Sequence, residues 1–113
     1  MKAGPKRYMV TIQRPEVDTD ESGAAFVARW VDVATVYAAI EALTGREWLA
    51  SAQFRPGVTT RIRINWREGI DASMRVLHRS TVYNIDAVIP QFQGMSELQL
   101  MCGDGVITEG GQP

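Results

Sequence analysis

The sequence predicts a mainly β protein: a small antiparallel β-barrel of about six strands, with one short α-helix and a long loop between the first two strands. Apolar and polar residues alternate with a period of two in several segments, and these segments are rich in Val, Ile, Thr, Tyr and Trp. The sequence has no strand–helix–strand pattern of the kind that indicates a parallel sheet. The 113 residues suffice for one domain, predicted over residues 8–102 between flexible ends at 1–7 and 103–113.

The first strand is predicted over residues 8–14, where YMVTIQR alternates before Pro15 stops it. The acidic, turn-rich segment PEVDTDESGA at 15–24 then predicts a long loop or the tip of a long hairpin. Residues 26–41, FVARWVDVATVYAAIE, are rich in β-branched and aromatic residues, so we expect a long, bent central strand. A helix is the alternative for this segment, because AAIEAL suits a helix.

A short helix is predicted from about residue 45 to residue 54. Thr44 and Glu47 have the spacing of a capping box, in which each side chain satisfies a backbone N–H group at the start of a helix. Leu43 and Trp48 occupy the two positions of a hydrophobic staple around the same cap. The proline that follows disfavours any continuation of the helix.

The strand predicted over residues 58–66 has the clearest alternation. One face is expected to point into the core, and it carries Thr60, Ile62, Ile64 and Trp66. The other face is expected to point outwards, and it carries Arg61, Arg63 and Asn65. A tight hairpin with strands at 74–78 and 81–88, a loop at 90–96 and a last strand at 97–102 complete the predicted domain.

Composition excludes several classes of protein. Twelve basic and thirteen acidic residues give a net charge of −1, which argues against a general nucleic-acid coat or a membrane-surface binder. A single cysteine, Cys102, and a single histidine, His78, predict neither an intrachain disulfide nor a zinc cluster, so no cofactor is expected. The acidic segment has no histidine partner for acid–base chemistry, and we predict no enzyme activity. Neither a signal peptide nor a membrane span is expected.

Arg61 and Arg63 project from one face of a predicted strand, and three interpretations remain open. They are solvated or paired with acidic neighbours, they form salt bridges between subunits, or they contact phosphate. The last interpretation corresponds to a nucleic-acid-binding module of the OB type, which combines basic residues with aromatic side chains that stack on bases.

The order of the segments resembles the phage head–tail joining proteins, also called head-closure or head–tail adaptor proteins of tailed bacteriophages. The matching segments are YMVTIQRP, a D-x-x-G loop, WVDVATVYAAIEALTGRE, TTRIRI, GIDASMRV, VYNIDAV and ELQLMC. The resemblance covers about residues 3–103. The ordered set carries it, above all WVDVATVYAAIE followed by GRE and RIRI.

The resemblance implies a structural protein of the phage neck that is monomeric in isolation and forms a ring in the virion after assembly in the host cytoplasm. Its partners would be the portal and adaptor proteins above and the tail proteins below, with DNA passing through the channel without sequence-specific binding. In some relatives a long loop plugs this channel. The corresponding plug or assembly residues here are Pro15, Glu16, Asp18, Asp20, Glu21 and Gly23.

The candidates for contacts between ring subunits are Arg46, Arg61 and Arg63. Two alternative functions remain: the OB-like nucleic-acid-binding module, and a tail-terminator or tail-completion protein, since several neck proteins resemble one another in fold.

Overall fold

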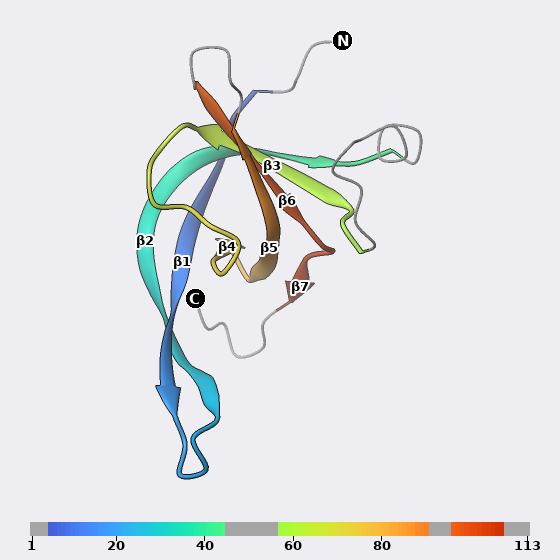
Figure 1. The fold of residues 1–113 in the computed structure, drawn as a ribbon. Coiled ribbons are helices and arrows are strands. Elements are labelled where there is room, and N and C mark those ends of the chain that lie inside the picture. Colours follow the sequence, from blue (N-terminus) through green and yellow to red (C-terminus); the bar gives the residue numbers. More distant parts are fainter. Residues whose placement is uncertain (1–4, 45–56, 91–95, 108–113) are drawn as a thin grey trace.

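The computed structural model of the chain describes residues 5–44, 57–90 and 96–107, and within these ranges it contains only β-strands (Figure 1). The strands are β1 (Tyr8–Thr19), β2 (Ala25–Ala42), β3 (Thr60–Asn65), β4 (Arg75–His78), β5 (Thr81–Pro90), β6 (Glu97–Cys102) and β7 (Val106–Ile107). Every pairing between them is antiparallel. The predicted mainly β, antiparallel class is confirmed, and the helix alternative for residues 26–41 is wrong because β2 spans them.

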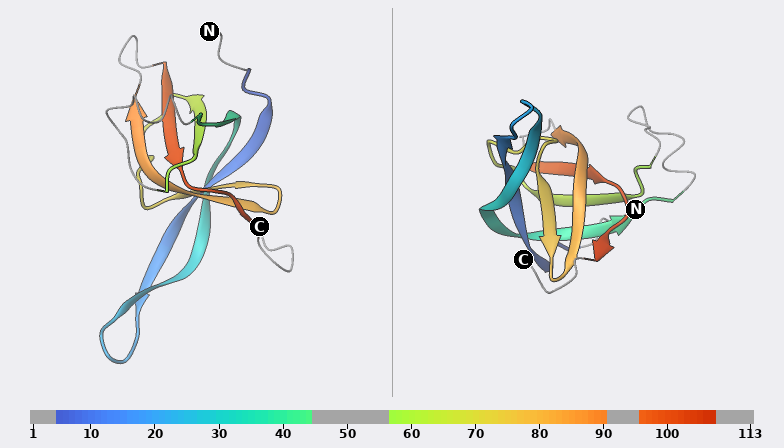
Figure 2. Two further views of the ribbon diagram at one scale, coloured as in Figure 1. Left: turned by 90° about the vertical axis from the view of Figure 1, so that its right-hand side faces the viewer. Right: turned by 90° about the horizontal axis from the view of Figure 1, so that it is seen from below.

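The sheet closes on itself. Its strand order is β4-β1-β2-β3-β6-β5-β7, and β4 also pairs with β5, so the first six strands form a ring around the core (Figure 2). The predicted hairpin at 74–88 forms β4 and β5, with the left-handed residue Arg79 in its two-residue turn. The short strand β7 lies inside the predicted tail and pairs with β5 through Val82 and Val106.

The core is aliphatic and lies inside the closed sheet. Its most deeply buried side chains are Val10, Ile12, Ile62, Ile64, Val76, Leu100 and Cys102. The predicted inward face of β3 is confirmed for Ile62 and Ile64 but is wrong for Trp66, which is 37% exposed. The reason is that β3 ends at Asn65, so the alternation does not extend to the tryptophan.

The first strand continues through Pro15 to Thr19, so the predictions that Pro15 ends it and that 15–24 forms a long loop are wrong. The alternative, the tip of a long hairpin, is confirmed: only residues 20–24 connect β1 to β2. Asp20 N donates to Ala24 O in this turn. Thr11 and Thr35 lie opposite each other with hydroxyl oxygens 3.3 Å apart, as in pairs that exchange no backbone hydrogen bonds, so the N–H of Thr11 points away from β2. Backbone groups alternate in direction along a strand, so the nitrogen of Pro15, four residues later, also points away from β2. On that side β1 has no further partner, since its pairing with β4 ends at Gln13, and an open edge tolerates proline.

The outer part of the β1–β2 hairpin projects from the closed sheet (Figures 1 and 2). After Gln13, β1 no longer pairs with β4, and before Ala38, β2 does not pair with β3. The projecting residues 14–31 therefore form a two-stranded ribbon, called the arm from here on. It gives the molecule an elongated shape of 51 × 29 × 27 Å.

The predicted helix at 45–54 lies outside the described residues, as do Glu47 and Trp48 of its cap and the contact candidate Arg46. Leu43 and Thr44 lie within the described part, just after β2. The backbone N–H of Leu43 donates to the carbonyl of Thr59 at 2.9 Å, so the chain on both sides of the undescribed segment is held together at this point.

Candidate assembly surface

The six residues predicted as a plug or assembly loop all lie on the arm. Three belong to β1 and three to the turn at its tip: Pro15, Glu16 and Asp18, then Asp20, Glu21 and Gly23. The arm is thus a paired ribbon with a defined register, whereas the sequence favoured an irregular loop.

The turn at the tip is organised by Asp20. Its carboxylate accepts hydrogen bonds from the backbone N–H and hydroxyl of Ser22, at 2.9 and 2.7 Å, and from the N–H of Ala24 at 3.0 Å. The hydrogen bonds from Ser22 and Ala24 hold the pKa of Asp20 below its usual value. Gly23 adopts φ of 89°, a left-handed conformation that glycine reaches without strain. Asp20 and Gly23 therefore have a structural role in the turn.

One face of the arm is apolar. Register pairs place Pro15 opposite Trp30 and Val17 opposite Val27, and Pro15 and Val17 share a face because they are two residues apart. Val17 is 62% exposed and Val27 is also exposed. Exposed apolar side chains gathered on one face of a projecting ribbon are typical of a protein–protein contact surface.

The other face of the arm is charged. Glu16 lies opposite Arg29, and Arg29 Nε is 2.5 Å from Glu16 Oε1. The hydrogen bond from Arg29 lowers the pKa of Glu16. Exposed pairs of this kind contribute little to stability, so the pair is better placed to define the surface that a partner meets. The apolar Phe26 lies beside this pair, opposite Asp18, and is exposed.

A polar cluster around the buried side chain of Gln13 fastens the arm where it leaves the closed sheet. Gln13 is only 2% exposed; its Nε2 donates to Asp32 Oδ1 at 2.9 Å, and its Oε1 accepts from Arg75 Nε at 2.8 Å. The guanidinium of Arg75 lies 4.2 Å from the ring centroid of Trp30, a cation–π contact. Burial lowers the pKa of Arg75. The cluster links β1, β2 and β4, and sequence reasoning missed it because no spacing pattern relates Gln13 to Arg75.

Arg61 and Arg63 form ion pairs within the chain, which favours the interpretation that they pair with acidic neighbours. Glu41 lies opposite Arg61 in the register of β2 and β3, and Arg61 Nε is 2.9 Å from its Oε1. Arg63 donates to Glu41 Oε2 from Nη2 at 3.0 Å and to Glu97 Oε2 from Nη1 at 2.8 Å. Lys6 completes the cluster, 2.6 Å from Glu97. The outward-facing Arg63 is only 6% exposed.

These contacts set the charge states of the cluster. Burial acts to raise the pKa of Glu41, but the hydrogen bonds from Arg63 and Arg61 outweigh it and hold the pKa below its usual value. Burial likewise opposes the charge of Arg63, but Glu41 and Glu97 hold its pKa above the usual value. Glu41 and Arg63 are therefore charged at neutral pH, and the cluster stabilises the sheet across β2, β3 and β6.

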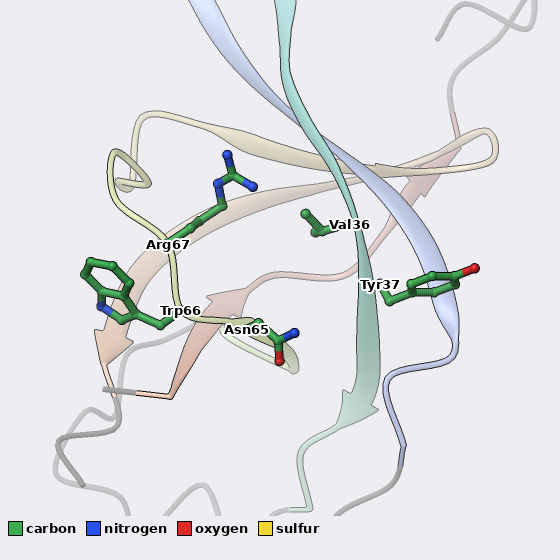
Figure 3. Close-up of a pocket in the computed structure, with 5 residues that line it drawn as sticks. All are labelled: Val36, Tyr37, Asn65, Trp66 and Arg67. Carbon is green, nitrogen blue, oxygen red and sulfur yellow. The ribbon is translucent and has the colours of Figure 1, made fainter. Parts of the chain in front are cut away.

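A pocket of about 300 Å³ opens where β3 separates from β2 (Figure 3). Val36 and Tyr37 of β2 line it together with Asn65, Trp66 and Arg67 from the end of β3 and the segment that follows. In the described part of the chain, no group of three His, Cys, Asp or Glu side chains is placed to hold a metal ion. Nor does any helix there have the length and apolar character needed to cross a membrane.

The chain is a β protein built as a closed antiparallel sheet with a projecting arm, and comparison with known families shows what kind of protein it is. The family model of the phage head completion protein matches residues 1–105. The chain therefore belongs to the phage head completion protein family, and it is a structural protein of the virion with a role in head closure. The resemblance stated from the sequence is confirmed.

Two solved structures share the fold. The solution structure of protein SF1141 from Shigella flexneri 2a is 26% identical, with a TM-score of 0.70 over 94% of this chain and 98% of that chain. A chain in the virion of a native gene transfer agent (GTA) particle is 15% identical, with a TM-score of 0.69 over 94% of this chain and 100% of that chain. A search of curated proteins found no match.

Proposed function

We propose that the chain is a ring subunit of the phage neck, which seals the DNA-filled head below the portal and its adaptor and docks the tail. Within this ring the arm is the element that contacts neighbouring proteins. The observation that carries the proposal is the apolar face of the arm, where Val17 and Val27 are exposed beyond the closed sheet. The core of the closed sheet is already complete without these side chains.

The position of the apolar residues supports an assembly role over a role in folding. Val17 and Phe26 lie beyond the last pairing of β1 with β4, so they pack against no other strand of the closed sheet. Burying an exposed side chain of this size against a partner contributes about 1.5–3 kcal/mol. Such residues become stabilising only in a complex, which is expected of a subunit that functions within an assembly.

The tip of the arm also suits a position beside DNA. Asp18, Asp20 and Glu21 are acidic and exposed, and phosphate groups of DNA would be repelled by them. A tip that enters the channel would obstruct DNA without binding it. The pairing of Arg61 and Arg63 with Glu41 removes the main support for the alternative of a nucleic-acid-binding module.

Deletion of the gene in its phage, followed by complementation from a plasmid, tests the proposal. We expect DNA-filled heads that lack tails and lose DNA, and full rescue by the wild-type chain. Heads that are empty because they never package DNA, or normal tailed particles, would contradict the proposal. Intact, stable heads with defects confined to the end of the tail would instead indicate the tail-terminator or tail-completion alternative.

A shortened arm then tests the role of this element. Removing residues 16–19 and 25–29 joins Pro15 to Asp20 and Ala24 to Trp30, and it keeps the turn and the Pro15↔Trp30 pair. We expect the shortened chain to fold but not to restore tails. Restored tails on heads that leak DNA would instead assign the arm to the channel alone. A companion variant exchanges the ion pair, as Glu16→Arg with Arg29→Glu; it keeps the length of the arm and tests whether its charged face takes part in the contact.

A further inference from the structure

The outer edge of β2 is open over a long distance. Among the residues that the structure describes, Ala25 to Tyr37 pair only with β1, because β3 joins the other edge of β2 at Ala38. These thirteen residues contain no proline or lysine, two residues that protect open edges from pairing, although bulges at Ala28 and Val33 interrupt the outer part of the stretch. The opposite edge of the arm, on β1, carries Pro15. The two edges of the same ribbon therefore differ. The regular part of the open edge of β2 runs from Ala34, just after the bulge at Val33, to Tyr37, beside the point where β3 joins.

Thr35 defines the direction of the backbone groups on this edge. The two-residue turn makes His78 and Thr81 a hydrogen-bonded pair, so the backbone groups of the preceding Leu77 point towards β1. Thr11 lies opposite Leu77, so its N–H points towards β4, and Thr35 lies opposite Thr11 on β2. The two hydroxyl oxygens are 3.3 Å apart, as expected where opposite residues do not exchange backbone hydrogen bonds and their side chains lie close together. The N–H and C=O groups of Thr35 consequently point away from β1 and into the open edge.

The pocket described above lies at the base of this open edge (Figure 3). Ala38↔Ile64 is the last pair between β2 and β3, and the next residues on both sides, Tyr37 and Asn65, line the pocket. A strand added to β2 would pass this point in the place that β3 vacates. The volume of about 300 Å³ accommodates one large apolar side chain of such a strand.

The rim of the pocket has the chemistry of a recognition site. Tyr37 and Trp66 are exposed aromatic residues, a type enriched where interfaces concentrate their binding energy. Arg67 lines the pocket on the side of Trp66, whereas the ring of Tyr37 points away from both (Figure 3). Among the described residues, Arg67 forms no ion pair with a carboxylate. An acidic residue in a bound segment would complement this charge.

We propose that the open edge of β2 and this pocket bind an extended segment of a different virion protein, which adds to β2 as a β-strand. The segment places one large apolar side chain in the pocket and an acidic side chain near Arg67. This inference rests on the proposed function, because the partner is another protein of the neck. The competing occupant is a second copy of this chain, which presents the same open edge of β2, and crosslinking distinguishes the two.

Photo-crosslinking in assembled particles tests the proposal. The deletion phage is complemented with a chain that carries the photoreactive amino acid p-benzoylphenylalanine in place of Tyr37, which is 58% exposed at the pocket. The matched control carries it in place of Tyr8, also an exposed tyrosine but outside the pocket. We expect the Tyr37 probe to crosslink to one virion protein other than this chain, through a peptide with an apolar and an acidic residue.

A backbone variant tests strand addition directly. Thr35→Pro removes the outward N–H group, and Thr35→Val removes the same hydroxyl but keeps that N–H. We expect the crosslink from position 37 to fall about tenfold with proline and to persist with valine. Melting temperatures of the purified variants identify any general loss of folding, and Arg67→Glu, which leaves the backbone intact, should reduce the same crosslink.

Three outcomes would overturn the proposal: crosslinks only to other copies of this chain, equal crosslinking from positions 8 and 37, or equal yields with proline and valine at position 35. Rescue of tails by the wild-type chain is scored in the same particles. The rescue of tails therefore tests the proposed function, and the crosslinks test strand addition separately.

Discussion

Replacing Glu41 with glutamine removes the charge at the centre of the ion-pair cluster. The Glu41 carboxylate accepts hydrogen bonds from Arg61 Nε at 2.9 Å and from Arg63 Nε and Nη2 at 3.1 and 3.0 Å. Glutamine has nearly the same volume but only one acceptor oxygen and no charge. Arg63 is nearly buried, so its guanidinium cannot be fully solvated in the variant.

The expected loss follows from what remains in the cluster. Removing one partner of a fully buried ion pair costs about 3–5 kcal/mol. Arg63 keeps Glu97 at 2.8 Å and Arg61 is partly exposed, so we expect Glu41→Gln to lower the free energy of unfolding by roughly half of this, about 2 kcal/mol. For a domain of this size the melting temperature at pH 7 should fall by about 8 °C.

The pH dependence gives the prediction a second readout. Burial acts to raise the pKa values of Glu41 and Glu97, but their cationic neighbours outweigh it and hold both below the ordinary value of 4.5. A carboxylate whose pKa is lower in the folded state than in the unfolded state stabilises the folded state at any pH above the unfolded-state pKa. This contribution is lost as the pH falls through the folded-state pKa. The difference in stability between wild type and Glu41→Gln should therefore shrink as the pH falls below 4.5.

Denaturant titrations at several pH values measure both effects, with Glu16→Gln as the matched control. Glu16 pairs with the exposed Arg29 on the arm, and we expect this control to show no resolvable change in melting temperature. If Glu41→Gln behaves like the control at pH 7, or if its deficit stays constant down to pH 3, the cluster does not stabilise the sheet through charge.

Three further predictions concern separate features. Arg75→Met removes the hydrogen bond to Gln13 and the cation over Trp30, and should cost about 1–2 kcal/mol and speed hydrogen exchange at the base of the arm; unchanged exchange would contradict the role of the cluster. Gly23→Ala places a side chain at φ of 89° but meets no atom within 4 Å, so urea unfolding should show a loss of about 1 kcal/mol from backbone strain alone. Burial raises the pKa of Cys102 to about 12, so a thiol reagent at pH 8 should label it only on unfolding, and rapid labelling of the folded chain would refute its burial.

Local alternation predicts most of the strands, since the burial of Ile62 and Ile64 follows from their spacing alone. The course of β1 could not be predicted in this way. Pro15 ends a strand only where its nitrogen faces a partner, and β1 has no partner on that side because β4 ends opposite Gln13. Trp66 was misplaced for a related reason: alternation continues in the sequence after the strand itself has ended.

The surface depends on register, which the sequence does not reveal. Arg61 and Arg63 were identified as a pair on one strand face, but their partner Glu41 comes from β2 and is placed beside them by the antiparallel pairing. Gln13 and Arg75 are 62 positions apart and meet only because β1 pairs with β4. The acidic residues around the tip were recognised from composition, and their division between a turn and a paired ribbon required the structure.

The continuity of β1 and β2 has a consequence for the strength of binding. Both strands run from the closed sheet into the arm without an intervening linker, and bulges beside Gln13 and Val17 bend the ribbon. A flexible loop loses conformational entropy when a partner fixes it, and that loss weakens the complex. The arm has already lost this entropy during folding, so more of the free energy gained by burying its apolar face remains as affinity.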